Sequence, residues 1–324
     1  QSAAPPRRGR RLSAAAVGAT WELRREQMIL PAARIVTPTG TQGSGFVVAH
    51  SEGATYVLTN HHVIRDCIQQ NDRWDPVDKS SKKVEQLLPV SVETFRYDER
   101  GRHLQTVTTS AEIAAYTVYG DKWSFEGDLA LLKLKIPLEG VPAVHVMAET
   151  TFVEEVRMLD EVIMVGCPDG SETPLPSTGH VASVTEQRAG VGLMLSQVFG
   201  NPGSSGSAVY RFSDERQQFE VVAVHSMIDG RGSLTDAGRG CFLRLGIPIT
   251  ELFGFLRRHG FEHLLVPKAA VGEDTSKPES NATSEEPTTG VEPVANVTMS
   301  NSTKAPPKKR VPRKKKSADP VSAS

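Results

Sequence analysis

The chain has 324 residues, of which 38% are hydrophobic, and its formal net charge is −1. A chain of this length and composition holds one or two globular domains with apolar cores. It contains no run of 18 or more apolar residues, so we expect no membrane-spanning helix.

The cysteine content excludes two classes of protein. The three cysteines, Cys67, Cys167 and Cys241, are odd in number and include no CxxC pair, so neither a zinc site nor a dense disulfide framework is expected. At most one bridge can form, and its pairing is left open.

The chain begins at Gln1 without a signal peptide, so we expect a processed product whose leader is missing. An extracytoplasmic or secreted protein is expected, with a viral polyprotein product as the alternative.

The first half of the chain predicts one short helix and several short strands. Residues 1–19 are rich in Ala, Pro and Arg, which indicates a flexible basic arm. Residues 20–28 combine the N-cap candidate Thr20 with helix-forming residues, which predicts a helix. The polar stretch 72–86 is expected to be a surface loop, and residues 97–102 a hairpin turn. Strands are expected at residues 34–37, 45–50, 54–59, 88–95 and 110–118.

The second half predicts a further set of strands and a closing helix. Turn residues occupy 167–179, and apolar side chains at helical spacing predict a helix over 248–259 with Gly260 as its C-cap. Strands are expected at residues 144–147, 161–166, 180–186, 191–197, 208–211, 219–226 and 242–247. Many short strands and few helices indicate an all-β fold of two six-stranded antiparallel β-barrels with a C-terminal helix.

The composition along the chain divides it into three parts. The arm at 1–19 precedes a single domain at 20–265, in which the two barrels occupy roughly residues 30–140 and 141–247. Residues 266–324 are rich in Ser, Thr, Pro and Glu, which predicts a disordered tail. The tail ends in a basic run, Lys308–Lys316, for which we expect a weak, salt-dependent contact with an anion or a nucleic acid. The alternative is a non-specific solubility tail.

Three stretches carry the residue types that nucleophilic catalysis by a serine requires. Residues 200–210 place Ser205 among glycines just before an apolar strand, where main-chain N–H groups can meet a developing oxyanion. Residues 57–64 form an apolar strand that runs into the pair His61 and His62, and a histidine can take the serine proton. Taken singly, each stretch also fits a plain turn or a structural histidine.

The third stretch, residues 127–134, is a glycine turn followed by Asp128 and a strongly apolar strand. A buried aspartate fixes the tautomer of a catalytic histidine and stabilises the imidazolium. Asp121 is a rival for this role, but no apolar strand follows it to bury its carboxylate. The order His, Asp, Ser, each at the end of an apolar strand, therefore predicts a catalytic triad.

These motifs resemble those of the HtrA and V8-like (glutamyl endopeptidase) serine proteases of the chymotrypsin fold. Residues 201–207 are similar to the serine motif of that group, residues 59–63 to its histidine motif and residues 128–132 to its aspartate motif. The resemblance covers roughly residues 30 to 260. It implies His62 as the general base rather than His61, Asp128 as the orienting acid and Ser205 as the nucleophile. It also implies an oxyanion hole made by the backbone N–H groups of Gly203 and Ser205.

The strand after the nucleophile resembles the S1 segment of glutamyl endopeptidases and of viral 3C-like proteases. By that match His225 lines the S1 pocket and hydrogen-bonds a P1 Glu or Gln, and Ser226 lies behind His62, within reach of Asp128. Gly200 stands where glutamyl endopeptidases carry Thr or Ser, and Phe199 is expected to make the pocket floor apolar. The alternative is a structural His225 and an apolar P1 residue, as in HtrA proteases.

The sequence therefore predicts a serine endopeptidase that acts on polypeptides through an acyl-enzyme. Neither a metal nor a cofactor is expected, and the nine histidines form no HExxH motif. HtrA proteins usually carry a PDZ domain, and we expect none in residues 266–324. An α/β-hydrolase esterase is a weaker alternative, because it needs G-x-S-x-G and the order Ser, Asp, His. A catalytically silent module on the same barrel, binding peptide or nucleic acid, is the alternative from another class.

Overall fold

Six antiparallel strands close into the first barrel. The computed structural model describes residues 20–117, 127–188, 190–228 and 243–265, so the predicted arm, the predicted tail and Asp121 lie outside the described residues. The strand order around the barrel is β1-β2-β3-β8-β7-β6. The strands are β1 (Ala32–Val36), β2 (Gln42–Ser51), β3 (Ala54–Thr59), β6 (Val90–Tyr97), β7 (His103–Tyr116) and β8 (Ala130–Leu134).

The second barrel is built in the same way from the C-terminal half. The sheet runs β13-β10-β11-β12-β15-β14, and the additional pairing of β13 with β14 closes these six strands into a ring. The short β9 (His145–Val146) pairs with β14 in parallel. The ring consists of β10 (Glu161–Gly166), β11 (Leu175–Arg188), β12 (Val191–Ser196), β13 (Ala208–Ser213), β14 (Gln218–Ile228) and β15 (Arg244–Pro248). The predicted all-β fold with two six-stranded barrels is confirmed.

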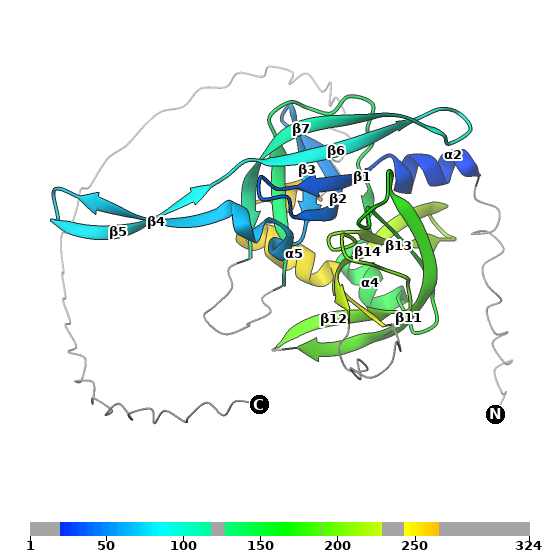
Figure 1. Ribbon diagram of the computed structural model, residues 1–324. Coiled ribbons are helices and arrows are strands. Elements are labelled where there is room, and N and C mark those ends of the chain that lie inside the picture. The colour runs from blue at the N-terminus through cyan, green and yellow to red at the C-terminus, as the bar shows by residue number, and fades with distance from the viewer. Residues whose placement is uncertain (1–19, 118–126, 189, 229–242, 266–324) are drawn as a thin grey trace, which may run out of the picture. The chain divides into compact units, whose positions relative to one another are not determined.

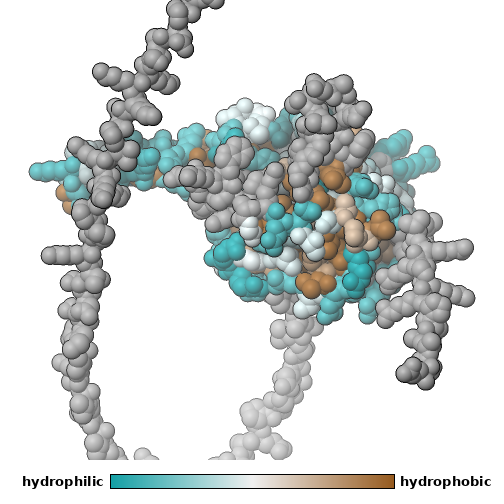
Figure 2. Space-filling model, turned by 90° about the horizontal axis from the view of Figure 1, so that it is seen from below, coloured by the Kyte–Doolittle hydropathy of each residue, from teal (hydrophilic) through white to brown (hydrophobic). Residues whose placement is uncertain are grey.

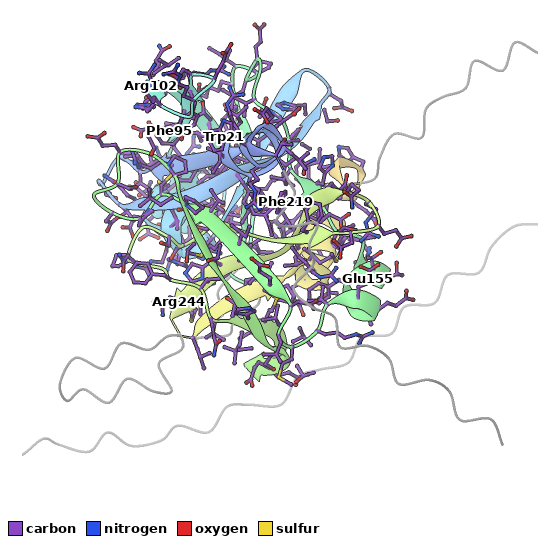
Figure 3. The ribbon with its side chains drawn as sticks, turned by 90° about the vertical axis from the view of Figure 1, so that its right-hand side faces the viewer. Trp21, Phe95, Arg102, Glu155, Phe219 and Arg244 are labelled. Atoms are coloured by element: carbon purple, nitrogen blue, oxygen red, sulfur yellow. The ribbon has the colours of Figure 1, made fainter. Side chains whose placement is uncertain are left out.

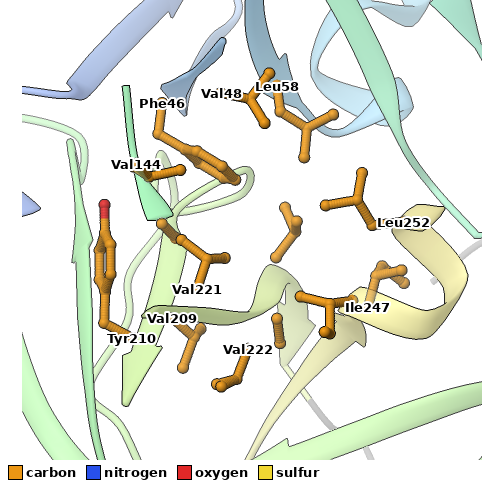
Figure 4. Close-up of a cluster of buried hydrophobic side chains, with 14 of the residues drawn as sticks. Phe46, Val48, Leu58, Val144, Val209, Tyr210, Val221, Val222, Ile247 and Leu252 are labelled. Carbon is orange, nitrogen blue, oxygen red and sulfur yellow. The ribbon is translucent and has the colours of Figure 1, made fainter. Parts of the chain in front are cut away.

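Strand periodicity explains how the barrels pack. Successive side chains point to opposite faces of a strand, and both faces of β3 are buried. Val57 lies in the core of the first barrel, whereas Leu58 belongs to a larger apolar cluster shared with the second barrel. Figure 4 shows part of this shared cluster, in which Leu58 of the first barrel and Val221 of the second lie in the same apolar core. This packing fixes the two barrels against each other, and residues from both reach the site described below.

The helices are short, and two of them lie near the ends of the domain. A four-residue helix, α2 (Trp21–Arg24), is capped by the Thr20 hydroxyl as predicted and continues into a π-helical turn, η1 (Arg25–Ile29). The closing helix α5 (Ile249–Arg258) is confirmed, and the 3-10 turn η3 (Glu262–Leu264) follows it. None of the helices in the described residues is long and apolar enough to cross a membrane.

Several elements differ from the sequence-based predictions, and β7, for example, begins at His103 rather than at residue 110. The stretch predicted as a polar surface loop is a two-stranded hairpin, β4 (Ile68–Asp75) and β5 (Ser80–Leu87). It projects from the first barrel (Figure 1), and its side chains are mostly hydrophilic (Figure 2). β11 begins at Leu175, inside the predicted turn region. The helix α4 (Glu149–Glu155) was not predicted.

Candidate active site

A hydrogen-bonded histidine–aspartate pair lies at the edge of the first barrel. His62 belongs to the short helix α3 (His61–Ile64), directly after β3, and Asp128 directly precedes β8. Pairing of β3 with β8 brings Thr59 opposite Ala130, and so brings the two segments together. The distance from His62 Nδ1 to Asp128 Oδ2 is 2.7 Å. The backbone N–H of His62 donates to the other carboxylate oxygen at 3.0 Å, so both oxygens hold the histidine.

The Asp128 carboxylate is fully buried and charged. Burial by itself raises its pKa, but the hydrogen bonds and charge of His62, together with the Ser226 hydroxyl, outweigh burial and hold the pKa below its ordinary value. Ser226 Oγ donates to Asp128 Oδ2 at 2.5 Å, which confirms the predicted hydrogen bond. The side chain of Asp128 has no exposed surface, whereas that of His62 is 35% exposed. Only the histidine of this pair can therefore meet a substrate.

The neighbouring His61 occupies a different environment. Its side chain is buried and its ring stacks on Tyr116, with ring centroids 5.5 Å apart. Burial lowers its pKa to about 4. His62 lines the cleft that also contains Ser205, and His61 does not. The structure thus separates the two histidines that the sequence left as rivals.

Ser205 lies in the loop between β12 and β13, held by the first barrel. The backbone N–H of Ser44 donates to the Ser205 carbonyl at 2.7 Å, and Ser44 Oγ donates to the Gly203 carbonyl at 2.7 Å. Gly206 takes a φ of +91°. A Cβ there would lie 2.0 Å from Ser44 O, so only glycine fits at this contact between the barrels. Sequence analysis missed Ser44, because nothing in β2 marks it as special.

The Ser205 hydroxyl is oriented toward Ser226. Its Oγ donates to the Ser226 carbonyl at 3.0 Å, and within the described residues no hydrogen bond joins it to His62. Ser205 and His62 nevertheless line the same cleft, whose volume is about 470 Å³. Catalytic hydrogen bonds are often absent from substrate-free enzymes and form when a substrate binds.

Two main-chain N–H groups beside Ser205 are available to a ligand. The N–H groups of Gly203 and Ser205 meet no acceptor among the described residues, whereas Ser204 N–H donates to Asn201 O at 3.0 Å. The Pro202 carbonyl accepts from Asp169 N–H at 2.8 Å. Because the carbonyl and the N–H of a trans peptide point in opposite directions, this bond turns the Gly203 N–H away from Asp169. Two such donors next to a hydroxyl can bind an oxyanion.

His225 and Gly200 lie together, as the sequence predicted for S1, and a third residue joins them. A Cβ built on Gly200 would lie 3.4 Å from His225 Nε2 and 3.3 Å from Arg244 Nε. Arg244 Nη2 donates to the Gly200 carbonyl at 2.8 Å; Figure 3 shows Arg244 on the second barrel. Burial and the nearby Arg244 charge lower the pKa of His225 to about 3. The sequence signal for Arg244 is a single cation at the start of an apolar strand.

Phe199 does not make the expected apolar floor. Its side chain is 68% exposed, which places the ring at the surface rather than beneath His225. Its backbone N–H donates to Ser177 Oγ at 2.8 Å, so this part of the loop is fixed with the ring turned outward.

The structure answers part of the question of cysteine pairing. Cys67 and Cys167 are buried free thiols, and Cys241 lies outside the described residues.

The two buried histidines predict a loss of stability in acid. A histidine whose pKa falls from 6.5 to about 4 (His61) or about 3 (His225) binds its proton more readily in the unfolded chain. Stability is therefore complete above pH 6.5 and falls as the pH is lowered. Between pH 6.5 and pH 4 we expect each histidine to reduce the free energy of unfolding by roughly 3 kcal/mol.

Urea unfolding at pH 7, 5.5 and 4.5 measures this effect. His61→Gln is expected to flatten the pH dependence, whatever its own stability at pH 7. The exposed His263 supplies the control variant, His263→Gln, which should leave the slope unchanged. Equal slopes in the wild type and His61→Gln would contradict the prediction.

The fold and this constellation are those of a chymotrypsin-like peptidase, and the family comparison agrees. Residues 43–224 match the model of the trypsin-like peptidase domain, and the chain belongs to this family. It is therefore a serine-type peptidase, and its substrates are polypeptides.

Solved structures provide more distant likenesses. The chain is similar to an inactive mutant of Rv3671c from M. tuberculosis H37Rv, with 16% identity, a TM-score of 0.42, and coverage of 71% of this chain and 86% of that chain. It is also similar to Deg5, with 17% identity, a TM-score of 0.46, and coverage of 74% and 92%. Comparison with curated proteins found no match.

Proposed function

We propose that this protein is an endopeptidase in which Ser205 is the nucleophile, His62 the general base and Asp128 the residue that orients the base. One observation carries the proposal. His62 Nδ1 lies 2.7 Å from the buried Asp128 carboxylate, and His62 and Ser205 line one cleft. A histidine held in this way by a carboxylate can act as a base toward a neighbouring hydroxyl.

The hydrogen bonds define the proton path. Because Asp128 accepts the Nδ1 proton, the lone pair of the His62 ring is on Nε2. The Ser205 hydroxyl turns from the Ser226 carbonyl to His62 Nε2 as it attacks the scissile carbonyl. His62 then gives the proton to the leaving amine, and water releases the acyl group by the same route. The N–H groups of Gly203 and Ser205 bind the oxyanion, each contributing roughly 10²–10³ to the rate.

We also propose that the S1 pocket takes Glu or Gln. A neutral, buried His225 has one N–H to donate to a side-chain carbonyl, and the Arg244 guanidinium lies beside the same position. Gly200 has no side chain that could come between a ligand and these two groups. The alternative is an apolar P1 residue, in which case His225 has a structural role only.

A peptide library with a randomised P1 position tests the pocket. We expect the wild type to cleave after Glu or Gln, and His225→Ala to lose at least about tenfold in kcat/KM on those peptides, since one hydrogen bond to the side chain is removed. His263→Ala, an exposed histidine, is the matched control. If the wild type cleaves after apolar residues and His225→Ala does so equally well, the S1 pocket takes an apolar residue and His225 has a structural role only.

The nucleophile is tested chemically. A fluorophosphonate probe forms a phosphorus–oxygen bond to an activated serine and releases fluoride, so a single adduct at Ser205 and loss of cleavage are expected. An adduct on Ser204 or Ser207 would contradict the assignment, since both are buried and hydrogen-bonded within the loop.

The anion contact predicted for Lys308–Lys316 stays a prediction, because that run lies outside the described residues.

A further inference from the structure

The cleft beside Ser205 has a position that suits the residues after the scissile bond. Its walls are residues 40–42 of the first barrel and residues 169–170 and 202–203 of the second, and His62 and Ser205 also line it. His225 and Gly200, which flank the proposed S1 pocket, do not line it. His62 protonates the leaving amine in the proposed mechanism, so the amine and the residues that follow it lie on the His62 side. The cleft is therefore the leaving-group side of the site.

Asp169 brings a negative charge to this cleft. It is the only acidic residue among the described residues that line it. A Cβ built on Gly203 would lie 2.4 Å from Asp169 Oδ1, so the carboxylate stands directly over the loop that carries the proposed oxyanion donors. Within the described part of the chain no cation and no hydrogen-bond donor pairs with this carboxylate.

The loop that carries Asp169 is fixed on both sides. The backbone N–H and the hydroxyl of Ser171 both donate to the Pro168 carbonyl, at 3.0 and 2.7 Å, which closes a tight turn around Asp169. Arg34 of the first barrel donates to the Ser171 carbonyl at 2.5 Å. Arg34 is itself held by Glu93 at 3.0 Å. The carboxylate therefore projects into the cleft from a fixed turn rather than from a free loop.

We propose that Asp169 is a specificity residue that makes the leaving-group side of the cleft select a basic residue immediately after the scissile bond. This inference rests on the proposed function. A Lys or Arg side chain there pairs with a carboxylate that lines the cleft and has no partner among the described residues. An acidic side chain at the same place meets a like charge. Because the carboxylate is exposed, the preference weakens with salt.

Partitioning of the acyl-enzyme tests the inference apart from S1. The enzyme is acylated with a peptide ester, and an amino-acid amide then competes with water. The amine attacks the ester carbonyl, the bond to Ser205 Oγ breaks, and His62 returns the amine proton to Ser205. The ratio of aminolysis to hydrolysis measures binding of the incoming amide on the leaving-group side. Argininamide, glutaminamide and glutamate amide are compared at low and high salt.

The wild type is expected to partition to argininamide about fivefold more than to glutaminamide at low salt, which is the range of an exposed ion pair. Asp169→Asn should abolish the difference, and Asp169→Glu should restore it. Asp160→Asn is the control. Asp160 pairs with Arg211 and does not line the cleft, so this variant should keep the preference for argininamide. An equal preference in Asp169→Asn, or none in the wild type, would overturn the inference. If no acyl-enzyme forms at all, the proposed function is wrong, and the inference that rests on it is wrong as well.

Discussion

Replacing Ser205 with alanine is expected to lower kcat by about 10⁶-fold while KM changes little. The substitution removes the oxygen that attacks the scissile carbonyl, and with it the acyl-enzyme. The cleft, His62 and the N–H donors of Gly203 and residue 205 itself remain, so a small rate above that of water is expected to persist. Among the described residues the Ser205 side chain makes one hydrogen bond, to the Ser226 carbonyl, so the fold should be retained. Cleavage kinetics on the best library peptide, with a thermal melt as the folding check, measure the result.

Ser207→Ala is the matched control for this variant. It removes the same atom two positions further along the loop, where the hydroxyl donates to the Ser204 carbonyl at 2.5 Å. Loss of one neutral hydrogen bond costs about 1 kcal/mol, so cleavage should remain within about tenfold of the wild type. If Ser207→Ala were as inactive as Ser205→Ala, or if Ser205→Ala kept its activity, the nucleophile would have to be reassigned.

Asp128→Asn is expected to lower kcat by about 10⁴-fold with the fold intact. The carboxylate accepts hydrogen bonds from the His62 ring, the His62 backbone N–H and the Ser226 hydroxyl. An asparagine offers one oxygen and a donor NH₂ group. With the NH₂ group toward the ring, His62 Nδ1 becomes an acceptor and the ring proton moves to Nε2. A base with a protonated Nε2 cannot take the Ser205 proton, so the loss appears in kcat.

The pH profile separates this explanation from simple unfolding. Cleavage by Asp128→Asn should recover with rising pH, when hydroxide can replace the lost base, while the thermal melt at neutral pH stays close to that of the wild type. Asp160→Asn provides the control for the chemical change, because Asp160 pairs with Arg211 on the second barrel. Its kcat should be unchanged. A similar loss in both variants would attribute the effect to stability.

Local sequence patterns predicted most of the fold. The strands over residues 54–59 and 161–166 were predicted with the bounds that the structure has, since they are mostly apolar runs between turns. The hairpin β4–β5 was missed because its side chains are almost all exposed and show no alternation of apolar and polar residues. Pairing with each other, rather than burial, defines these strands. The start of β11 was missed because turn-type residues occupy a strand there.

The sequence by itself determined which chemical groups the site contains. The local features are a histidine after one apolar strand, an aspartate before another and a serine among glycines. Each of these residues is positioned by the strand next to it. It could not choose between His61 and His62 on physical grounds, because neighbouring residues of one helical turn point about 100° apart and either can face a partner. Only the pairing of β3 with β8 decided the matter, by placing the Asp128 carboxylate against His62. Arg244 and Asp169 reach the site through contacts between segments far apart in the chain, and no local pattern records which segments will meet.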